Sequence, residues 1–169
     1  DREGLTQFLV RSLGLRPGFT EFVKWCRSRR YGMSIASNDF GFYIEATLAA
    51  AGISGIPVYR NDVLFTSPPS AVPGRVNPRC GACPTCKVQV VKEIAQTYSF
   101  VAYVGDGLGD RFAAVHADAI FARDLLREYC LKNKIAHMPW WSFYDIMDEM
   151  KTGLPPVNQR GLNLCPIDP

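Results

Sequence analysis

The fold of this chain is constrained most by an apolar strand that runs into a glycine-flanked aspartate. The stretch is Tyr103-Val-Gly-Asp-Gly-Leu-Gly-Asp110, and the segment after it, 111–117, has a helical pattern. Strand, carboxylate and helix in this order are typical of an open α/β sheet, which binds ligands at the carboxyl ends of its strands. Asp106 and Asp110 are therefore candidate ligands for a hard cation such as Mg2+. The alternative is a strand-to-helix turn in which one of these aspartates caps the helix.

The other predicted elements indicate the same fold class. Helical periodicity covers residues 1–15, 20–30, 40–51, 87–98, 125–132 and 142–151, and short apolar strands are predicted at 31–36 and 119–121. Residues 56–59 and 63–66 flank Arg60-Asn-Asp62, which predicts a hairpin or a strand pair, and the proline-rich segment 67–78 is typical of a loop. Because strands alternate with helices, we predict an α/β fold with a parallel sheet covered by helices.

Polar side chains follow two of these strands and begin one of these helices. Ser37 and Asn38 come directly after the strand at 31–36, Lys87 starts a helix after a polar loop, and Asp106 follows the strand of the opening motif. If these groups converge at one sheet edge, they suit a phosphorylated ligand with a divalent cation. The hydroxyl and backbone N–H groups would bind phosphate oxygens, the lysine would neutralise charge, and the carboxylates would hold the metal.

In combination, six motifs resemble those of haloacid dehalogenase (HAD) superfamily phosphatases. They are similar to the phosphoserine-phosphatase-like branch, which includes methionine-salvage and phosphoethanolamine/phosphocholine phosphatases. The motifs lie in the same order as in that branch, from about Leu13 to Met150. They are Pro17-Gly-Phe19, Ser37-Asn-Asp-Phe-Gly-Phe-Tyr-Ile-Glu45, Cys80-Gly-Ala-Cys-Pro-Thr-Cys-Lys87, Tyr103-Val-Gly-Asp-Gly-Leu-Gly-Asp-Arg111, Ala117-Asp-Ala-Ile-Phe-Ala-Arg123 and Phe143-Tyr-Asp-Ile146.

The resemblance implies a three-layer, Rossmann-like HAD core and a role for each matching residue. Ser37 would hold the phosphate together with the backbone at Asn38 and Gly107. Lys87 would stabilise charge on the transferring phosphoryl group, and Asp106 would be a Mg2+ ligand. Asp110 would support the metal directly or through water, or would orient Lys87.

One motif of the superfamily is missing from these 169 residues. HAD phosphatases carry Asp-x-Asp-Gly-[Thr/Ser] after their first strand, and the first aspartate of that motif is the nucleophile. We therefore predict that residues 1–15 are a remnant of a cap or connecting helix, that 16–152 form the core, and that 153–169 are an irregular tail. In the superfamily the missing strand lies between the strands that end at Ser37 and Asp106. We expect that a longer chain or a partner chain supplies it, or that the two flanking strands pair differently.

The cysteine-rich segment before Lys87 has two interpretations. Cys80, Cys83 and Cys86 could provide three thiolate ligands to Zn2+, with a fourth ligand from elsewhere. Alternatively, the cysteines shape the loop that leads into Lys87, because the resembling branch often carries a similar segment. The uneven distribution of the six cysteines favours a reducing, cytoplasmic compartment over a disulfide scaffold.

The sequence therefore predicts a Mg2+-dependent phosphomonoester hydrolase of a small phosphorylated metabolite, present here without its nucleophile segment. Two alternatives are a catalytically inactive module that binds phosphate and metal, and a subunit completed by a partner chain. A net charge of +3 is too small to indicate a nucleic-acid surface, and no apolar run reaches the length of a membrane span.

Overall fold

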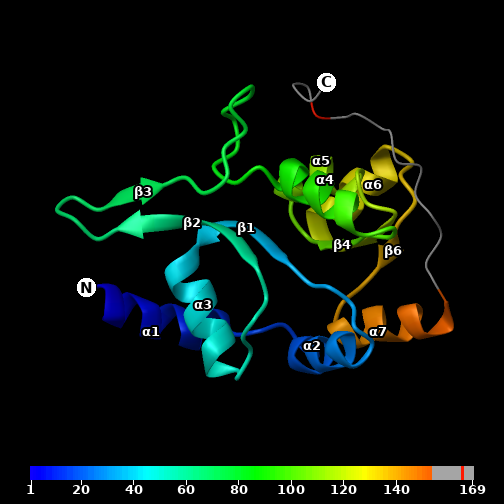
Figure 1. Ribbon diagram of the computed structural model, residues 1–169, viewed down its shortest axis with the longest axis horizontal. Helices are drawn as coiled ribbons and strands as arrows, with labels where there is room; N and C mark the ends of the chain where they lie inside the picture. The colour runs from blue at the N-terminus through cyan, green and yellow to red at the C-terminus, as the bar shows by residue number, and fades with distance from the viewer. Residues whose placement is uncertain (154–164, 166–169) are drawn as a thin grey trace. The chain divides into compact units, whose positions relative to one another are not determined.

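The computed structural model describes residues 1–153 and 165 (Figure 1). The chain divides into two compact units, and the boundary in the sequence falls between Cys86 and Lys87. The first unit contains α1 (Arg2–Leu13), α2 (Phe19–Ser28), β1 (Ile35–Phe40), α3 (Gly41–Ala50), β2 (Val58–Leu64) and β3 (Ser70–Val72). The second contains α4 (Lys87–Thr97), β4 (Ala102–Gly105), η1 (Leu108–Asp110), α5 (Arg111–Ala114), β5 (Ala119–Ala122), α6 (Asp124–Lys132), β6 (Met138–Pro139) and α7 (Phe143–Thr152). The predicted mixed α/β class with parallel strands is confirmed. In the part of the chain that the structure describes, no helix combines the length and the apolar character needed to cross a bilayer.

The first unit is a three-stranded sheet packed against helices. β1 pairs parallel with β2, and β2 pairs antiparallel with β3. Helix α3 connects β1 to β2 and contacts both α1 and β2 (Figure 1). The core of the unit is centred on Val23 of α2, Leu48 of α3 and Ile53 of the loop after α3, against which partly buried apolar residues from α2, α3 and both parallel strands pack. The periodicity that predicted α2 corresponds to the side chains that it buries, whereas α1 has no buried residue.

The prediction for residues 56–78 is wrong in two respects. Arg60-Asn-Asp62 is not a turn, because β2 runs through it without a break, and part of the predicted loop forms strand β3. The polar residues fit a strand because their side chains are satisfied. Arg60 forms ion pairs with Glu45 and Asp62, and Asn61 is buried with hydrogen-bond partners. β3 is exposed throughout, so it carries no apolar alternation from which the sequence could predict it.

Strand β1 starts later than predicted and includes the polar residues that were expected to follow it. Its register with β2 is regular from Ile35 to Ala36, and it resumes only at Phe40, which pairs with Asn61. Three residues of β1, 37–39, therefore lie opposite the single residue Arg60 of β2. We call this irregular segment, residues 37–39, the β1 bulge. The predicted polar turn at these residues is therefore part of the strand, and the bulge re-aims its side chains.

The second unit is a parallel sheet in the order β4-β5-β6. All four residues of β5 are buried, as expected for a parallel strand that is covered on both faces. Helix α5 ends at Ala114 although the sequence predicted a helix to residue 117. The N–H groups of His116 and Ala117 bond three residues back, and this tighter turn leads the chain into β5. The short strand β6 was not predicted.

The described strands form two three-stranded sheets, and β1 and β4 each stand at one end of the order of their own sheet. One edge of each of these strands is therefore unpaired by any other described strand. The predicted irregular tail, 153–169, falls outside the described residues except for Gly153 and Cys165.

Candidate functional site

A buried ion pair connects the start of α4 to the end of η1. The ammonium of Lys87 donates a hydrogen bond to Oδ1 of Asp110 at 2.6 Å, and the two side chains are 14% and 7% exposed. The hydroxyl of Tyr103, from β4, donates to the same oxygen at 2.8 Å. Three elements thus place a lysine, a tyrosine and an aspartate together at the carboxyl end of β4, where an open α/β sheet binds its ligands.

The second carboxylate oxygen of Asp110 holds the turn after β4. Oδ2 accepts from the backbone N–H of Asp106 at 3.1 Å and from that of Gly107 at 3.0 Å. Each oxygen of Asp110 therefore accepts two hydrogen bonds, which is the full acceptor capacity of a carboxylate. Of the roles left open for Asp110, this geometry favours orienting Lys87 and conflicts with direct metal ligation. The N–H of Gly107, predicted to contact a phosphate, is likewise already engaged by Asp110.

A glycine is required where Asp110 approaches the end of β4. A Cβ at Gly105 would lie 2.9 Å from Oδ2 of Asp110 and equally close to a methyl group of Leu126. The carbonyl of Gly105 accepts a hydrogen bond from the indole N–H of the buried Trp140. Because any larger residue at Gly105 would displace the carboxylate, this glycine helps to form the ion pair.

The charge of Lys87 helps to keep the pKa of Asp110 below its ordinary value. Burial by itself would raise the pKa of Asp110, but the charge of Lys87 and the hydrogen bonds from Lys87, Gly107 and Tyr103 outweigh it and lower the pKa below its ordinary value. Burial and the adjacent charge of Asp110 raise the pKa of Tyr103. At neutral pH the cluster therefore consists of an aspartate anion, a neutral tyrosine and a lysine.

Asp106 is the acidic residue of this end of β4 that suits a metal ion. It follows β4 directly, it is half-buried, and its backbone N–H is held by Asp110. Mg2+ in proteins is usually bound by one or two carboxylates and keeps several waters, so a single aspartate fits part of its shell. Among the described residues, no three His, Cys, Asp or Glu side chains gather to hold a metal. The remaining ligands would come from water or from groups outside this set.

The predicted phosphate-binding residues Ser37 and Asn38 lie in the first unit, in the β1 bulge. The Ser37 hydroxyl donates to Oδ2 of Asp39 at 3.0 Å and accepts from the N–H of Asp39 at 3.1 Å. Tyr43 of α3 also hydrogen-bonds Asp39, and burial followed by the charge of Asp39 raises the pKa of Tyr43. Since Ser37 and Lys87 belong to different units, their convergence on one ligand stays a prediction.

The structure does not gather the three cysteines as a zinc site. Within the described residues, no group of three metal-binding side chains exists, and Cys80 is half-buried, Cys83 exposed and Cys86 buried. All six cysteines of the chain are free thiols. The geometry favours the alternative interpretation, in which this segment shapes the loop. The backbone agrees with that role, because Cys80 Sγ accepts from the N–H of Ala82 and the N–H of Cys86 donates to the carbonyl of Arg75.

Three residues of these networks were not predicted from the sequence. Tyr103 looked like an ordinary strand residue, although its position in the motif three residues before Asp106 was a usable signal. Asn61 and Thr85 are 4% and 1% exposed and hydrogen-bond each other at 2.8 Å. No local pattern distinguishes a buried asparagine from a turn asparagine, because the difference depends on partners that are distant in sequence.

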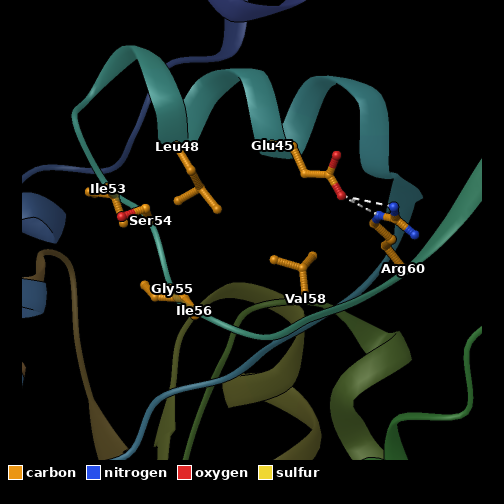
Figure 2. Close-up of a pocket in the computed structure, with 8 residues that line it drawn as sticks. All are labelled: Glu45, Leu48, Ile53, Ser54, Gly55, Ile56, Val58 and Arg60. Atoms are coloured by element: carbon orange, nitrogen blue, oxygen red, sulfur yellow. Dashed lines mark hydrogen bonds and ion pairs between the residues drawn. The ribbon is translucent and has the colours of Figure 1, made fainter.

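A cavity of about 330 Å³ lies between α3 and β2 in the first unit. Figure 2 shows that the ion pair between Glu45 and Arg60 borders it, and apolar side chains form most of the remaining wall. Its lining residues are Glu45, Leu48, Ile53, Ser54, Gly55, Ile56, Val58 and Arg60. None of the residues predicted for phosphate or metal binding lines this cavity, so it is separate from the candidate site.

Comparison with known proteins identifies the class of protein that carries this site. The family model of the haloacid dehalogenase-like hydrolases matches residues 5–118, and the chain belongs to this family. The resemblance drawn from the sequence motifs is thereby confirmed.

The chain is also similar to phosphatases. The chain is 31% identical over 150 residues to the 2-hydroxy-3-keto-5-methylthiopentenyl-1-phosphate phosphatase of Bacillus cereus strain G9842, a match that covers 87% of this chain and 68% of that protein. It is 27% identical over 149 residues to the phosphatase of the same name from Brevibacillus brevis, which covers 86% of this chain and 67% of that protein. The chain is thus a distant relative of these phosphatases over most of its length.

Proposed function

We propose that this chain provides the phosphate-binding and Mg2+-binding residues of a phosphomonoester hydrolase that acts on a small phosphorylated metabolite. The observation that carries the proposal is the ion pair between Lys87 and Asp110 at the carboxyl end of β4, next to Asp106. A lysine held at this edge by a buried aspartate keeps a positive charge in a defined position, as transfer of a phosphoryl group requires. The phosphatase names of the similar proteins support the same reaction class.

Each residue of the site has a distinct task in this proposal. Lys87 neutralises charge on the phosphoryl group, and Asp110 is a positioning residue because it acts through Lys87. Mg2+, held by Asp106, would supply charge neutralisation at the phosphate oxygens. The Ser37 hydroxyl would donate a hydrogen bond to a phosphate oxygen, and the backbone at Asn38 would help to bind the phosphate. For this step the Ser37 hydroxyl must leave Asp39, to which it donates in this structure.

The nucleophile is proposed to lie on a segment other than these residues. The 169-residue sequence contains no Asp-x-Asp-Gly motif, so covalent catalysis needs an aspartate from elsewhere. β1 and β4 each present an edge of backbone N–H and C=O groups that no other described strand pairs. An unpaired strand edge is a template for an added strand, whether from the same polypeptide or from a partner chain.

A second candidate function is a catalytically inactive module that binds phosphate and metal. The lack of an Asp-x-Asp-Gly motif among these 169 residues favours it, because such a module needs no nucleophile. The two candidates make different predictions about turnover and the same prediction about phosphate binding.

The test combines an intact-mass measurement with two assays. We expect the 169-residue chain to bind inorganic phosphate in the presence of Mg2+, followed by phosphorus NMR, and to show no hydrolysis of p-nitrophenyl phosphate. We expect a native form with a mass well above 18.8 kDa to hydrolyse it. Turnover by the 169-residue chain that Asp106→Asn abolishes would contradict a nucleophile outside these residues. A heavier native form without turnover would favour the inactive module, and the lack of phosphate binding would contradict both functions.

A further inference from the structure

The buried side chain of Asn61 connects three segments of the first unit. Its Nδ2 donates to the carbonyl of Asn38 in the β1 bulge at 2.5 Å. Its Oδ1 accepts from the N–H of Gly74, in the loop after β3, at 3.0 Å and from the hydroxyl of Thr85 at 2.8 Å. These three bonds lie within the unit formed by residues 1–86.

The orientation of this amide follows from its partners. The backbone N–H of Gly74 can only donate, and the backbone carbonyl of Asn38 can only accept. The Asn61 amide must therefore direct its oxygen toward Gly74 and its NH2 group toward Asn38, and no flipped arrangement satisfies both. A buried amide with this many partners is expensive to disturb, because any partner that loses its bond is left unsatisfied away from water.

The bond to Asn38 acts on Ser37 through one peptide group. The carbonyl of Asn38 and the N–H of Asp39 belong to the same planar peptide unit, so fixing one of them fixes the direction of the other. That N–H donates to the Ser37 hydroxyl at 3.1 Å. Asn61 thus holds the carbonyl of Asn38, and the N–H of Asp39 in the same peptide group orients the predicted phosphate-binding hydroxyl of Ser37.

The other two partners hold Asn61 in place. Gly74 approaches β2 so closely that a Cβ there would lie 1.8 Å from the carbonyl oxygen of Arg60. Thr85 is 1% exposed, and it stands two residues before Lys87 in the chain. The amide is therefore held by a loop that lies directly against β2 and by the segment that leads into the predicted phosphate-binding lysine.

We propose that Asn61 is a positioning residue for phosphate binding, which sets the peptide between Asn38 and Asp39 and thereby the hydroxyl of Ser37. This inference rests on the proposed function, because it assigns Asn61 to the same phosphate site. The bond to Asn38 carries this role because it ends on the β1 bulge, whereas the bonds to Gly74 and Thr85 hold Asn61 itself in place.

The test uses Asn61→Asp and a matched control. An aspartate keeps an oxygen for Gly74 and Thr85 but loses the donor, and it places a carboxylate oxygen against the carbonyl of Asn38. The control, Val23→Ala, truncates a residue that is 1% exposed at the centre of the core of the same unit. Two quantities are measured on the 169-residue chain: hydrogen exchange of the Asp39 amide by nitrogen-15 NMR, and the affinity for inorganic phosphate with Mg2+.

Relative to the control, we expect Asn61→Asp to speed exchange of the Asp39 amide and to weaken phosphate binding, each by about ten-fold. Thr85→Val, which removes one bond to Asn61, should change both in the same direction by about two- to five-fold; it serves alone if Asn61→Asp does not fold. Effects of Asn61→Asp and Thr85→Val no larger than those of Val23→Ala would overturn the role of Asn61 and leave the proposed function standing. Failure of the unmodified chain to bind phosphate would overturn the proposed function and, with it, the assignment of Asn61 to that site.

Discussion

The ammonium of Lys87 lies 2.6 Å from Oδ1 of Asp110, and both side chains are largely withdrawn from solvent. These residues are 23 positions apart in sequence, and the fold brings them together at the carboxyl end of β4. A buried ion pair is stable only when its remaining hydrogen-bonding groups are satisfied. Tyr103 and two backbone N–H groups meet this condition for the aspartate.

Replacing Asp110 should destabilise the second unit in a pH-dependent way. Asp110→Asn leaves Lys87 buried without its counter-charge, and removing one partner of a buried pair costs about 3–5 kcal/mol of unfolding free energy. The pKa of Asp110 is lower in the folded state than its ordinary value of 3.8. The stabilisation is therefore fully present above that value and is lost as the pH falls through the folded pKa.

Urea unfolding of the wild type and Asp110→Asn at a series of pH values measures this effect. The difference in unfolding free energy should be constant from neutral pH down to about pH 5 and should shrink below about pH 4. Lys87→Met is the matched variant, which removes the other member of the pair. It should lower the unfolding free energy by less than Asp110→Asn does, because Asp110 keeps three hydrogen-bond donors. A difference that does not change with pH would show that the charge of Asp110 is not what stabilises the unit.

Replacing Lys87 should weaken phosphate binding, and the loss should be larger when the new side chain carries no positive charge. Lys87→Met removes a charged hydrogen-bond donor, which is worth about 1.5–3 kcal/mol. It should lower the affinity for inorganic phosphate about ten- to hundred-fold. Lys87→Arg keeps the charge but changes the shape of the donor group, so its loss should be smaller. Phosphorus NMR titration gives both affinities, and equal affinities for the wild type and Lys87→Met would exclude a phosphate-binding role for this lysine.

Asp106 should be the residue of this turn on which Mg2+ binding depends. Asp106→Asn removes a carboxylate ligand, and we expect Mg2+ affinity measured by calorimetry to fall by about ten-fold or more. Asp148→Asn is the matched control, because Asp148 is an exposed aspartate of α7 that pairs with Lys151. If both substitutions have the same effect on Mg2+ affinity, the metal is bound by general surface charge.

Removing the charge of Asp39 should strengthen phosphate binding. Asp39→Asn keeps an oxygen for the Ser37 hydroxyl but removes the repulsion between a carboxylate and the incoming phosphate, worth about 1 kcal/mol or five-fold in affinity near water. The pKa of Tyr43, which burial and then the charge of Asp39 raise, should fall toward its ordinary value. Ultraviolet titration of the tyrosines checks the second effect. A weaker phosphate affinity in this variant would mean that Asp39 assists binding.

The helices and the fold class were predictable because their signals are local. Apolar side chains at helical spacing define the buried face of α2, whose Phe22, Val23 and Cys26 are buried, and the structure confirms that helix to within two residues of the prediction. The motif around Asp106 also kept its predicted order of strand, turn and helix. Such features depend on residues within a few positions of one another.

Residues of mixed character were predicted less well. The run at Arg60, Asn61 and Asp62 has the composition of a turn, and yet it forms the middle of β2. Its strand conformation depends on Glu45, Gly74 and Thr85, which neutralise or hydrogen-bond these side chains from elsewhere in the chain. A sequence with low strand propensity can form a strand when residues from elsewhere in the chain satisfy its polar groups.

By itself, the sequence determined the mixed α/β class, the family and the residue types that suit phosphate and metal, because these follow from periodicity and from motifs in a fixed order. Only the tertiary structure decided which groups Asp110 contacts. The same aspartate was compatible with a metal ligand, a helix cap or a partner of Lys87, and these roles differ only in which atoms its two oxygens face. Folding placed a lysine, a tyrosine and two backbone N–H groups around it, and with its four acceptor positions filled, Asp110 became the residue that holds Lys87.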